Sequence, residues 1–295
     1  MVSLEEMNGY IWWNGKFIEW QNAKIPLTAH SLHYAGTVFE GIRIYNKKPF
    51  KQLEHYKRLL KSAEAMGYII PYALELLCDV TNNLIEINNL TAGYIRPFAW
   101  RGGEEHHIRG MNCKIHTAII AYNPFTGKKR PNIGLRLEIS KWKKIPESAA
   151  PLHSKASGLY MMATIIQNEA TKNGFDDAIM LDQNGFLTEG TTSNFFFIKD
   201  NIIHTPIADN FLNGITRQTV INEVADKLKL KVIENKFKIE DLKDAQAAFL
   251  TGTAAGVLKI ASIYSHEHKK SFEFSIADTL LENIIYTYNK IVGAY

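Results

Sequence analysis

The segment at residues 123–131, NPFTGKKRP, divides the sequence into two parts. Its proline, glycine and lysine content is typical of a linker between domains. Both flanking parts contain alternating and helical apolar patterns, so each should combine strands with helices. A chain of 295 residues with 46% hydrophobic residues can form two cores. We therefore expect an α+β protein of two α/β domains, a small one at 1–122 and a large one at 132–295, joined by a linker at 123–131.

The N-terminal part opens with a predicted hairpin. Two aromatic runs in IWWNGKFIEW are joined by Asn14-Gly15, a dipeptide typical of two-residue hairpin turns. Further strands are expected at 37–45, 92–100 and 114–122. Helical spacing predicts two helices between them, one carrying Leu53, Tyr56, Leu60, Ala63 and Met66, the other Leu77, Val80, Leu84 and Ile87.

The C-terminal part repeats this mixture. Residues 132–140 alternate apolar and polar side chains, as a half-buried strand does. Asn184-Gly185 predicts a second hairpin. Helices are expected near 158–173, 216–229 and 276–291.

Charge and cysteine content exclude several classes. The net charge of +4 comes from scattered lysines, and the densest runs, 128–130 and 141–144, are short, which disfavours nucleic-acid binding. Cys78 and Cys113 are too sparse for a disulfide framework. The sequence shows neither a signal-peptide pattern nor an apolar run long enough to span a membrane, so we expect a cytoplasmic protein.

Lys155 is the first candidate catalytic residue. It lies in SKASGLY, among small residues that would let a lysine stand in a crowded site. A lysine whose pKa is lowered by desolvation or by a neighbouring cation can form an imine with a carbonyl. A solvated loop lysine is the ordinary alternative, so this segment alone decides nothing.

Three other segments suggest a phosphorylated cofactor. Glu189 lies between two apolar runs, where its carboxylate could keep a pyridine nitrogen protonated, although it could equally serve as a turn residue. Thr216 opens a predicted helix and is either an N-cap or part of an anion seat. The small residues of GTAAG (252–256) would let backbone amides approach a ligand, or form an ordinary turn.

These segments resemble the fold-type IV pyridoxal-phosphate enzymes, and most closely the branched-chain amino-acid aminotransferases. The resemblance covers nearly the whole chain in matching order. It is carried by HSLHYAGTVFEGIR (30–43), EHYKRL (54–59), YIRP (94–97), SKASGLY (154–160), LTEGTTSN (187–194), GITR (214–217) and GTAA (252–255).

The resemblance implies a pyridoxal 5'-phosphate site in the cleft between the two domains, the C-terminal domain being the cofactor-binding one. Lys155 would bond the cofactor aldehyde, Glu189 would pair with the ring nitrogen, and Tyr160 would bind the ring oxygen. The implied cofactor-binding residues are Arg58, Lys155, Tyr160, Glu189, Asn194, Leu212, Ile215, Thr216 and Thr253. The implied substrate-binding residues are Tyr34 from the partner chain, Phe39, Tyr94, Arg96, Thr253 and Ala254, with no metal.

The implied activity is reversible transamination of leucine, isoleucine or valine with 2-oxoglutarate by a homodimer or larger homo-oligomer. Lys155 would be the catalytic base, and Arg96 would receive the distal carboxylate of glutamate. D-amino-acid aminotransferase and aminodeoxychorismate lyase, on the same fold, remain alternatives. A metal hydrolase built on Glu104, Glu105 and nearby histidines is disfavoured because no H-E-x-x-H spacing occurs.

Two segments depart from the family pattern. Gly256, Val257, Leu258 and Lys259 follow GTAA where a glutamate and threonine-proline are usual. His106, His107 and Arg109 follow YIRP where small or apolar residues are usual. These three side chains would favour a more polar substrate if they faced the pocket, and would be without effect on it if they faced water.

Overall fold

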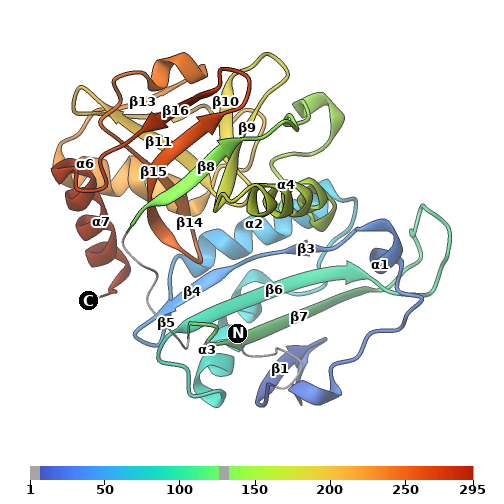
Figure 1. The fold of residues 1–295 in the computed structure, drawn as a ribbon. Helices are drawn as coiled ribbons and strands as arrows, with labels where there is room; N and C mark the ends of the chain where they lie inside the picture. Colours follow the sequence, from blue (N-terminus) through green and yellow to red (C-terminus); the bar gives the residue numbers. More distant parts are fainter. Residues whose placement is uncertain (1–6, 126–132, 295) are drawn as a thin grey trace. The chain divides into compact units, whose positions relative to one another are not determined.

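The computed structural model describes residues 7–125 and 133–294, which fall into two units (Figure 1). The first unit comprises residues up to Lys128 together with Ser154–Tyr160, and the second comprises Lys129–His153 and Met161–Tyr295. Residues 126–131 of the expected linker lie outside the described residues. Ser154–Tyr160 belongs to the first unit, whereas the expected C-terminal domain, 132–295, included it.

A seven-stranded antiparallel sheet forms the first unit, in the order β2-β1-β7-β6-β4-β5 with β3 beside β6. Its strands are β1 (Tyr10–Trp13), β2 (Lys16–Glu19), β3 (Val38–Phe39), β4 (Ile42–Tyr45), β5 (Lys48–Pro49), β6 (Gly93–Arg101) and β7 (Ile115–Tyr122). The Asn14-Gly15 hairpin is confirmed, because Trp13 pairs with Lys16. The single strand expected at 37–45 is interrupted, since Glu40 and Gly41 separate β3 from β4.

Two helices cover one face of this sheet. They are α2 (Gln52–Ala65) and α3 (Leu74–Ile87), and the short α1 (His30–Tyr34) and a 3-10 turn (Trp20–Asn22) precede them. The core buries aliphatic side chains of the strands against α2 and α3. Both expected helices are present, but Leu53 of the predicted apolar stripe is 46% exposed and Leu59 is buried instead.

Residues 154–160 join the first unit through backbone pairing. Ala156 forms a bridge with Val38, the Phe39 amide donates to the Lys155 carbonyl at 3.1 Å, and the Ser157 amide donates to Thr37 at 2.8 Å. The Lys155 amide donates to the Ser62 hydroxyl of α2 at 2.9 Å. The segment therefore lies beside β3, a long-range pairing that no local sequence pattern predicts.

The second unit is a nine-stranded mixed sheet. Its order is β10-β9-β8-β15-β14-β11-β12-β13, with β16 beside β15, and a further β10–β11 pairing closes β10, β9, β8, β15, β14 and β11 into a ring. The strands are β8 (Leu135–Ile139), β9 (Asp177–Leu181), β10 (Leu187–Gly190), β11 (Asn194–Lys199), β12 (Ile202–Pro206), β13 (Val232–Asn235), β14 (Ala247–Gly252), β15 (Gly256–Ser265) and β16 (Lys270–Glu273). The ring brings the amino end of β11 next to the carboxyl end of β10, where Glu189 pairs with Asn194.

The helices of the second unit occur where the sequence predicts them. They are α4 (Met161–Lys172), α5 (Ile215–Thr219), α6 (Ala225–Leu228) and α7 (Thr279–Val292), with 3-10 turns at Glu147–Ala149 and Ile239–Leu242. The helix expected at 158–173 begins as a 3-10 turn, Ser157–Tyr160, before α4. The helix expected at 216–229 contains a π turn, Val220–Val224, between α5 and α6.

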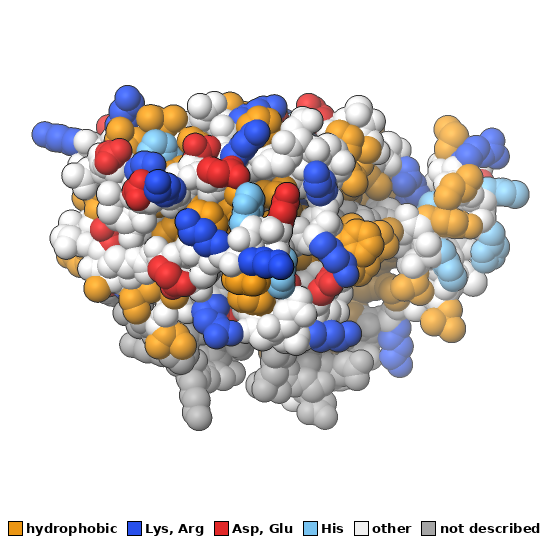
Figure 2. Space-filling view, turned by 45° about the horizontal axis from the view of Figure 1, so that its top comes forward, with side chains coloured by type: hydrophobic (Ala, Val, Ile, Leu, Met, Phe, Trp, Pro, Cys, Tyr) orange, Lys and Arg blue, Asp and Glu red, His pale blue; other side chains and the backbone are white. Residues whose placement is uncertain are grey.

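The surface carries charges of both signs. Figure 2 shows lysine and arginine side chains interspersed with aspartate and glutamate on the face in view, which fits the scattered charge of the sequence. Within residues 7–125 and 133–294, we find no helix of the length and apolarity that crossing a membrane requires.

Candidate active site

Lys155 is held by its backbone and directs its amine at an aromatic hydroxyl. Its Nζ lies 2.5 Å from the Tyr160 hydroxyl and 4.8 Å from the centres of both the Phe39 and the Tyr160 rings. The two rings lie 4.9 Å apart, edge to face. Phe39 and Tyr160 thus form an aromatic wall around the lysine amine.

The surroundings lower the pKa of Lys155 to about 8. Loss of hydration on burial is the largest cause; the Glu40 carboxylate opposes it, and the charge of Arg58 adds to it. Roughly a tenth of the unlinked side chain is therefore a neutral amine at pH 7, far more than for an ordinary lysine. Such an amine can act as a nucleophile or a base.

Arg58 lies on α2 beside a fully buried carboxylate, Glu40. Its Nε donates to Glu40 Oε1 at 2.6 Å and its Nη2 donates to Oε2 at 2.9 Å. The third nitrogen, Nη1, is buried and has no hydrogen-bond partner among the residues that the structure describes. Glu40 thus holds one edge of the guanidinium, and Nη1 remains as a charged donor for an anion.

Tyr94 and Arg96 alternate along β6 and lie near the same aromatic wall. The Arg96 guanidinium lies 4.8 Å from the Phe39 ring centre and 5.4 Å from that of Tyr94, and its Nη2 lies 3.5 Å from the Tyr94 hydroxyl. Gly41 makes room for this arrangement, because a Cβ at that position would overlap the Tyr94 hydroxyl. Arg96 Nε is also buried, and no group within residues 7–125 and 133–294 forms a hydrogen bond with it.

Glu189 is the centre of a polar cluster in the second unit. Its Oε1 accepts from Lys144 Nζ at 2.5 Å, and its Oε2 accepts from Asn194 Nδ2 at 3.3 Å. Asn194 Nδ2 also donates to the Leu212 carbonyl at 3.0 Å, and Asn194 Oδ1 accepts from the Gly214 amide at 3.1 Å. Asn194 therefore ties the carboxylate to the loop that leads into α5.

Helix α5 starts one residue earlier than expected. Gly214 is its N-cap, so the interpretation of Thr216 as the N-cap is wrong. Gly214 takes this place because it packs directly on the Asn194 amide, where a Cβ would overlap Asn194 Oδ1. Ile215 and Thr216 are then the first two helical residues, whose amides have no acceptor within the helix.

The turn between β14 and β15 contains Thr253 and Ala254, and Gly252 pairs with Gly256 across it. Thr253 is half-buried and Ala254 is exposed. Glu189 pairs with Asn194, and Asn194 pairs with Thr251, so this turn lies at the same edge of the sheet as the carboxylate.

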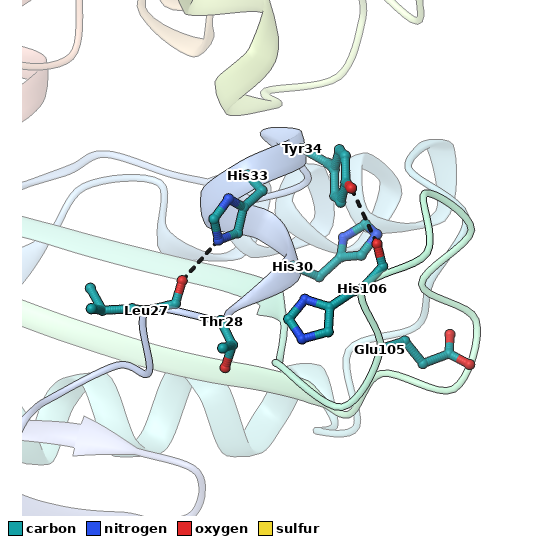
Figure 3. A pocket seen from close by; sticks show the side chains of 7 residues that line it. All are labelled: Leu27, Thr28, His30, His33, Tyr34, Glu105 and His106. Atoms are coloured by element: carbon teal, nitrogen blue, oxygen red, sulfur yellow. Dashed lines mark hydrogen bonds between the residues drawn. The ribbon is translucent and has the colours of Figure 1, made fainter.

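The loop after β6 carries the histidines that depart from the family pattern. Figure 3 shows a pocket of about 290 Å³ between this loop and α1, lined by Leu27, Thr28, His30, His33, Tyr34, Glu105 and His106. The Tyr34 hydroxyl donates to the His106 carbonyl at 3.1 Å. The side chains of His106, His107 and Arg109 are exposed. The chain by itself therefore directs Tyr34 to this loop, and it leaves His107 and Arg109 exposed together with His106, which lines this pocket.

The first unit brings Phe39, Arg58, Tyr94, Arg96, Lys155 and Tyr160 together, and the second brings Glu189, Asn194, Leu212, Ile215 and Thr216 together. A family model described as amino-transferase class IV matches residues 37–263, a range that contains both groups.

The chain belongs to the class IV aminotransferase family.

The relatives of this class IV aminotransferase have closely similar lengths. A probable branched-chain-amino-acid aminotransferase of Rickettsia conorii is 42% identical over 285 residues, which are 96% of this chain and 97% of the relative. The branched-chain aminotransferase of Thermoproteus uzoniensis, solved with norvaline, has a TM-score of 0.89 at 30% identity, covering 98% of this chain and 96% of that one. The Thermobaculum terrenum enzyme, solved in its PLP form, has a TM-score of 0.87 at 28% identity, covering 97% and 95%.

Each unit of this class IV aminotransferase, taken by itself, offers groups that suit a part of pyridoxal phosphate. In the first unit, Arg58 Nη1 is a buried charged donor without a partner among the described residues, and in the second unit the first-turn amides of α5 suit an anion. Glu189 offers a carboxylate, and Lys155 an amine of lowered pKa. These are the groups that a phosphate, a pyridine nitrogen and an aldehyde require.

Three residues that contact the expected site residues within each unit were not predicted from the sequence. Glu40 and His55 contact each other and Glu40 contacts Arg58, and Lys144 contacts Glu189. Glu40 is an acidic residue inside an apolar strand pattern, which was an available signal. Lys144 was visible only as the last residue of a short basic run.

Proposed function

We propose that this protein catalyses the reversible transamination of leucine, isoleucine or valine with 2-oxoglutarate, giving branched-chain 2-keto acids and L-glutamate. The observation that carries this proposal is Lys155, whose amine lies 2.5 Å from the Tyr160 hydroxyl and whose pKa is lowered to about 8. The similarity to branched-chain aminotransferases supports the substrate class.

The proposed cofactor is pyridoxal 5'-phosphate. It supplies an aldehyde that bonds amines and a ring that withdraws electrons from the substrate α-carbon. Lys155 would bond the aldehyde, Tyr160 would bind the ring oxygen, Leu212 would pack on the ring and Glu189 would pair with the ring nitrogen, with Asn194 holding Glu189. Arg58, Ile215, Thr216 and Thr253 bind the phosphate.

Lys155 is also the proposed general base. Its free amine would take the proton from the substrate α-carbon, and its ammonium form would return a proton in the second half of the transfer. The pKa near 8 suits both halves of this transfer, because both protonation states are populated near neutral pH.

The remaining residues orient the substrate. Tyr94 and the amides of Thr253 and Ala254 bind the α-carboxylate, and Phe39 lines the pocket for the aliphatic side chain. Arg96, with an unpartnered buried Nε, pairs with the distal carboxylate of glutamate. Tyr34 of a second copy completes the pocket.

A homodimer is the proposed assembly. Three apolar side chains, one just before α1 and two in the loop after β6, are largely exposed: Leu27 by 84%, Ile108 by 71% and Met111 by 79%. Exposed apolar side chains gathered around one loop are typical of a protein interface. A solution mass of twice the 33.5 kDa chain, measured by light scattering, is expected; a mass of one chain at micromolar concentration would contradict it.

The activity is tested by a half-reaction. The protein loaded with pyridoxal phosphate is mixed separately with L-leucine and with D-alanine, and the visible absorption band of the cofactor is followed. Loss of the band with L-leucine alone supports the proposal. Loss with D-alanine alone would assign the chain to the D-amino-acid branch of the family, and no visible band at all would contradict the cofactor.

A further inference from the structure

We propose that Glu40, supported by His55, is a positioning residue that holds Arg58 in its phosphate-binding orientation before the cofactor arrives. This inference rests on the proposed function, in which Arg58 binds the phosphate. It concerns two side chains that the proposed reaction itself does not use.

Both carboxylate oxygens of Glu40 accept hydrogen bonds from groups that fix its position. Besides the two bonds from Arg58, Oε2 accepts from His55 Nδ1 at 2.7 Å and from the Gly41 amide at 3.2 Å. The Glu40 amide donates to the Pro97 carbonyl of β6 at 2.8 Å. The carboxylate is therefore anchored to the break between β3 and β4, and it cannot turn toward a ligand without leaving these partners.

The bond pattern determines which part of Arg58 remains available. A carboxylate that binds Nε and Nη2 takes one edge of the planar guanidinium, and a second anion must use Nη1. That nitrogen is the one that is buried without a hydrogen-bond partner. Glu40 thus occupies the Nε–Nη2 edge of the guanidinium and fixes the direction in which Nη1 points.

Charge balance explains why the carboxylate is needed before the cofactor binds. The Arg58 side chain is only 16% exposed, and a buried cation without a counter-ion is costly. Burial alone would raise the pKa of Glu40, but the charge of Arg58 and the hydrogen bonds from His55 and Arg58 hold it well below its usual range. Burial lowers the pKa of His55, so His55 is a neutral donor. Glu40 and Arg58 are therefore a neutral pair.

The test compares two ligands that differ only in the phosphate. Dissociation constants of pyridoxal phosphate and pyridoxal are measured on the cofactor-free protein, and their ratio is taken. Both ligands can bond Lys155 through the aldehyde, although free pyridoxal must first open the hemiacetal that its 5'-hydroxyl forms. That cost is the same for every variant, so the change of the ratio between variants isolates the phosphate contacts. Arg58→Met is the reference variant and should reduce the preference for the phosphorylated ligand about 10-fold to 100-fold.

Glu40→Gln should reduce that preference about 10-fold or more while binding of pyridoxal changes little. The amide keeps the shape of the side chain but turns one acceptor into a donor facing Arg58 or His55. The matched control is Glu138→Gln, which alters another buried carboxylate, bonded to His266 at 2.7 Å, in the second unit. The control should leave the ratio unchanged.

The outcomes separate the two proposals. An unchanged ratio in Glu40→Gln, with a reduced ratio in Arg58→Met, would overturn the role of Glu40 and leave the phosphate site intact. An unchanged ratio in Arg58→Met would show that Arg58 does not bind the phosphate. It would overturn both the phosphate-binding role of Arg58 and the positioning role of Glu40. Equal weakening of both ligands by Glu40→Gln would show a structural role only, and would also overturn the inference.

A second pair of variants decides the question if Glu40→Gln does not fold. His55→Leu removes one donor to Glu40, and His55→Asn restores a donor close to the position of Nδ1. The phosphate preference should fall in His55→Leu and recover in His55→Asn. Failure of the asparagine to restore a lost preference, or no loss with leucine, would overturn the inference.

Discussion

The amine of Lys144 lies 2.5 Å from a carboxylate oxygen of Glu189, with the two side chains only 18% and 10% exposed. At that distance and burial the contact favours the ionised carboxylate. The pairing places a cation beside the carboxylate that is proposed to face the cofactor ring, so under that proposal the ring nitrogen and Lys144 would share one carboxylate.

Glu189→Gln should separate stability from catalysis. The change leaves Lys144 without its charged partner and should lower the free energy of unfolding by roughly 1–3 kcal/mol. It also removes the negative charge beside the ring nitrogen, so kcat should fall. Thermal or urea unfolding and a steady-state assay measure the two effects. Adding Lys144→Met should restore stability without restoring kcat; recovery of kcat in the double variant would contradict the assignment of Glu189.

Lys155→Ala should lower turnover by at least about 10²-fold to 10⁴-fold, because it removes the general base as well as the amine that bonds the aldehyde. Lys141→Ala is the matched control, since Lys141 is 65% exposed and pairs with Glu169 on the surface. Single-turnover kinetics with L-leucine compare the two. Near-normal turnover by Lys155→Ala would exclude Lys155 as the catalytic lysine.

Labelling of Lys155 in the cofactor-free protein should increase with pH around a midpoint of about 8, whereas ordinary lysines titrate near about 10.4. Brief acetylation at a series of pH values, read by peptide mass spectrometry, measures each lysine in one sample. Because the folded state lowers this pKa, the unfolded chain binds the proton more readily between about 8 and the ordinary value. The contribution of Lys155 to stability therefore rises with pH in that window. A labelling midpoint near 10 would refute the shift.

Gly41→Ala should displace Tyr94, because the added Cβ overlaps the Tyr94 hydroxyl. Overpacking of this kind typically costs about 1–3 kcal/mol of stability. If Tyr94 binds the substrate carboxylate, KM for L-leucine should also rise. Gly158→Ala is a control for stability, since its Cβ would meet Ala35 at an ordinary 3.4 Å. Unchanged KM in folded Gly41→Ala would argue against the role of Tyr94.

Local patterns predicted most of the elements. The Asn14-Gly15 turn set the register of the first hairpin, and helical spacing located α2 and α3. The break at Glu40 was not predicted, because it depends on Arg58 and His55, which lie 18 and 15 residues away. The start of α5 was also misplaced, since packing of Gly214 on Asn194 decides it.

Lys155, Glu189, Thr216 and Thr253 lie in segments whose residue types suggested the chemistry, so the sequence could name them. Glu40, His55 and Lys144 act through other side chains, and their partners are brought near by pairing of distant segments. Such supporting residues carry no local pattern. The placement of residues 154–160 beside β3 is of the same kind, because it depends on the whole sheet.

The division of the chain at 128, 153 and 160 has a consequence for biosynthesis. Most of the first unit is synthesised early, but the segment whose Ala156 bridges to Val38 follows 25 residues assigned to the second unit, Lys129–His153. The nascent N-terminal unit therefore cannot complete its folding until residue 160 has left the exit tunnel. Until then, one edge of β3 stays unpaired. The segment that completes the unit, Ser154–Tyr160, carries Lys155. The newly made protein therefore gains this amine only when the first unit has finished folding.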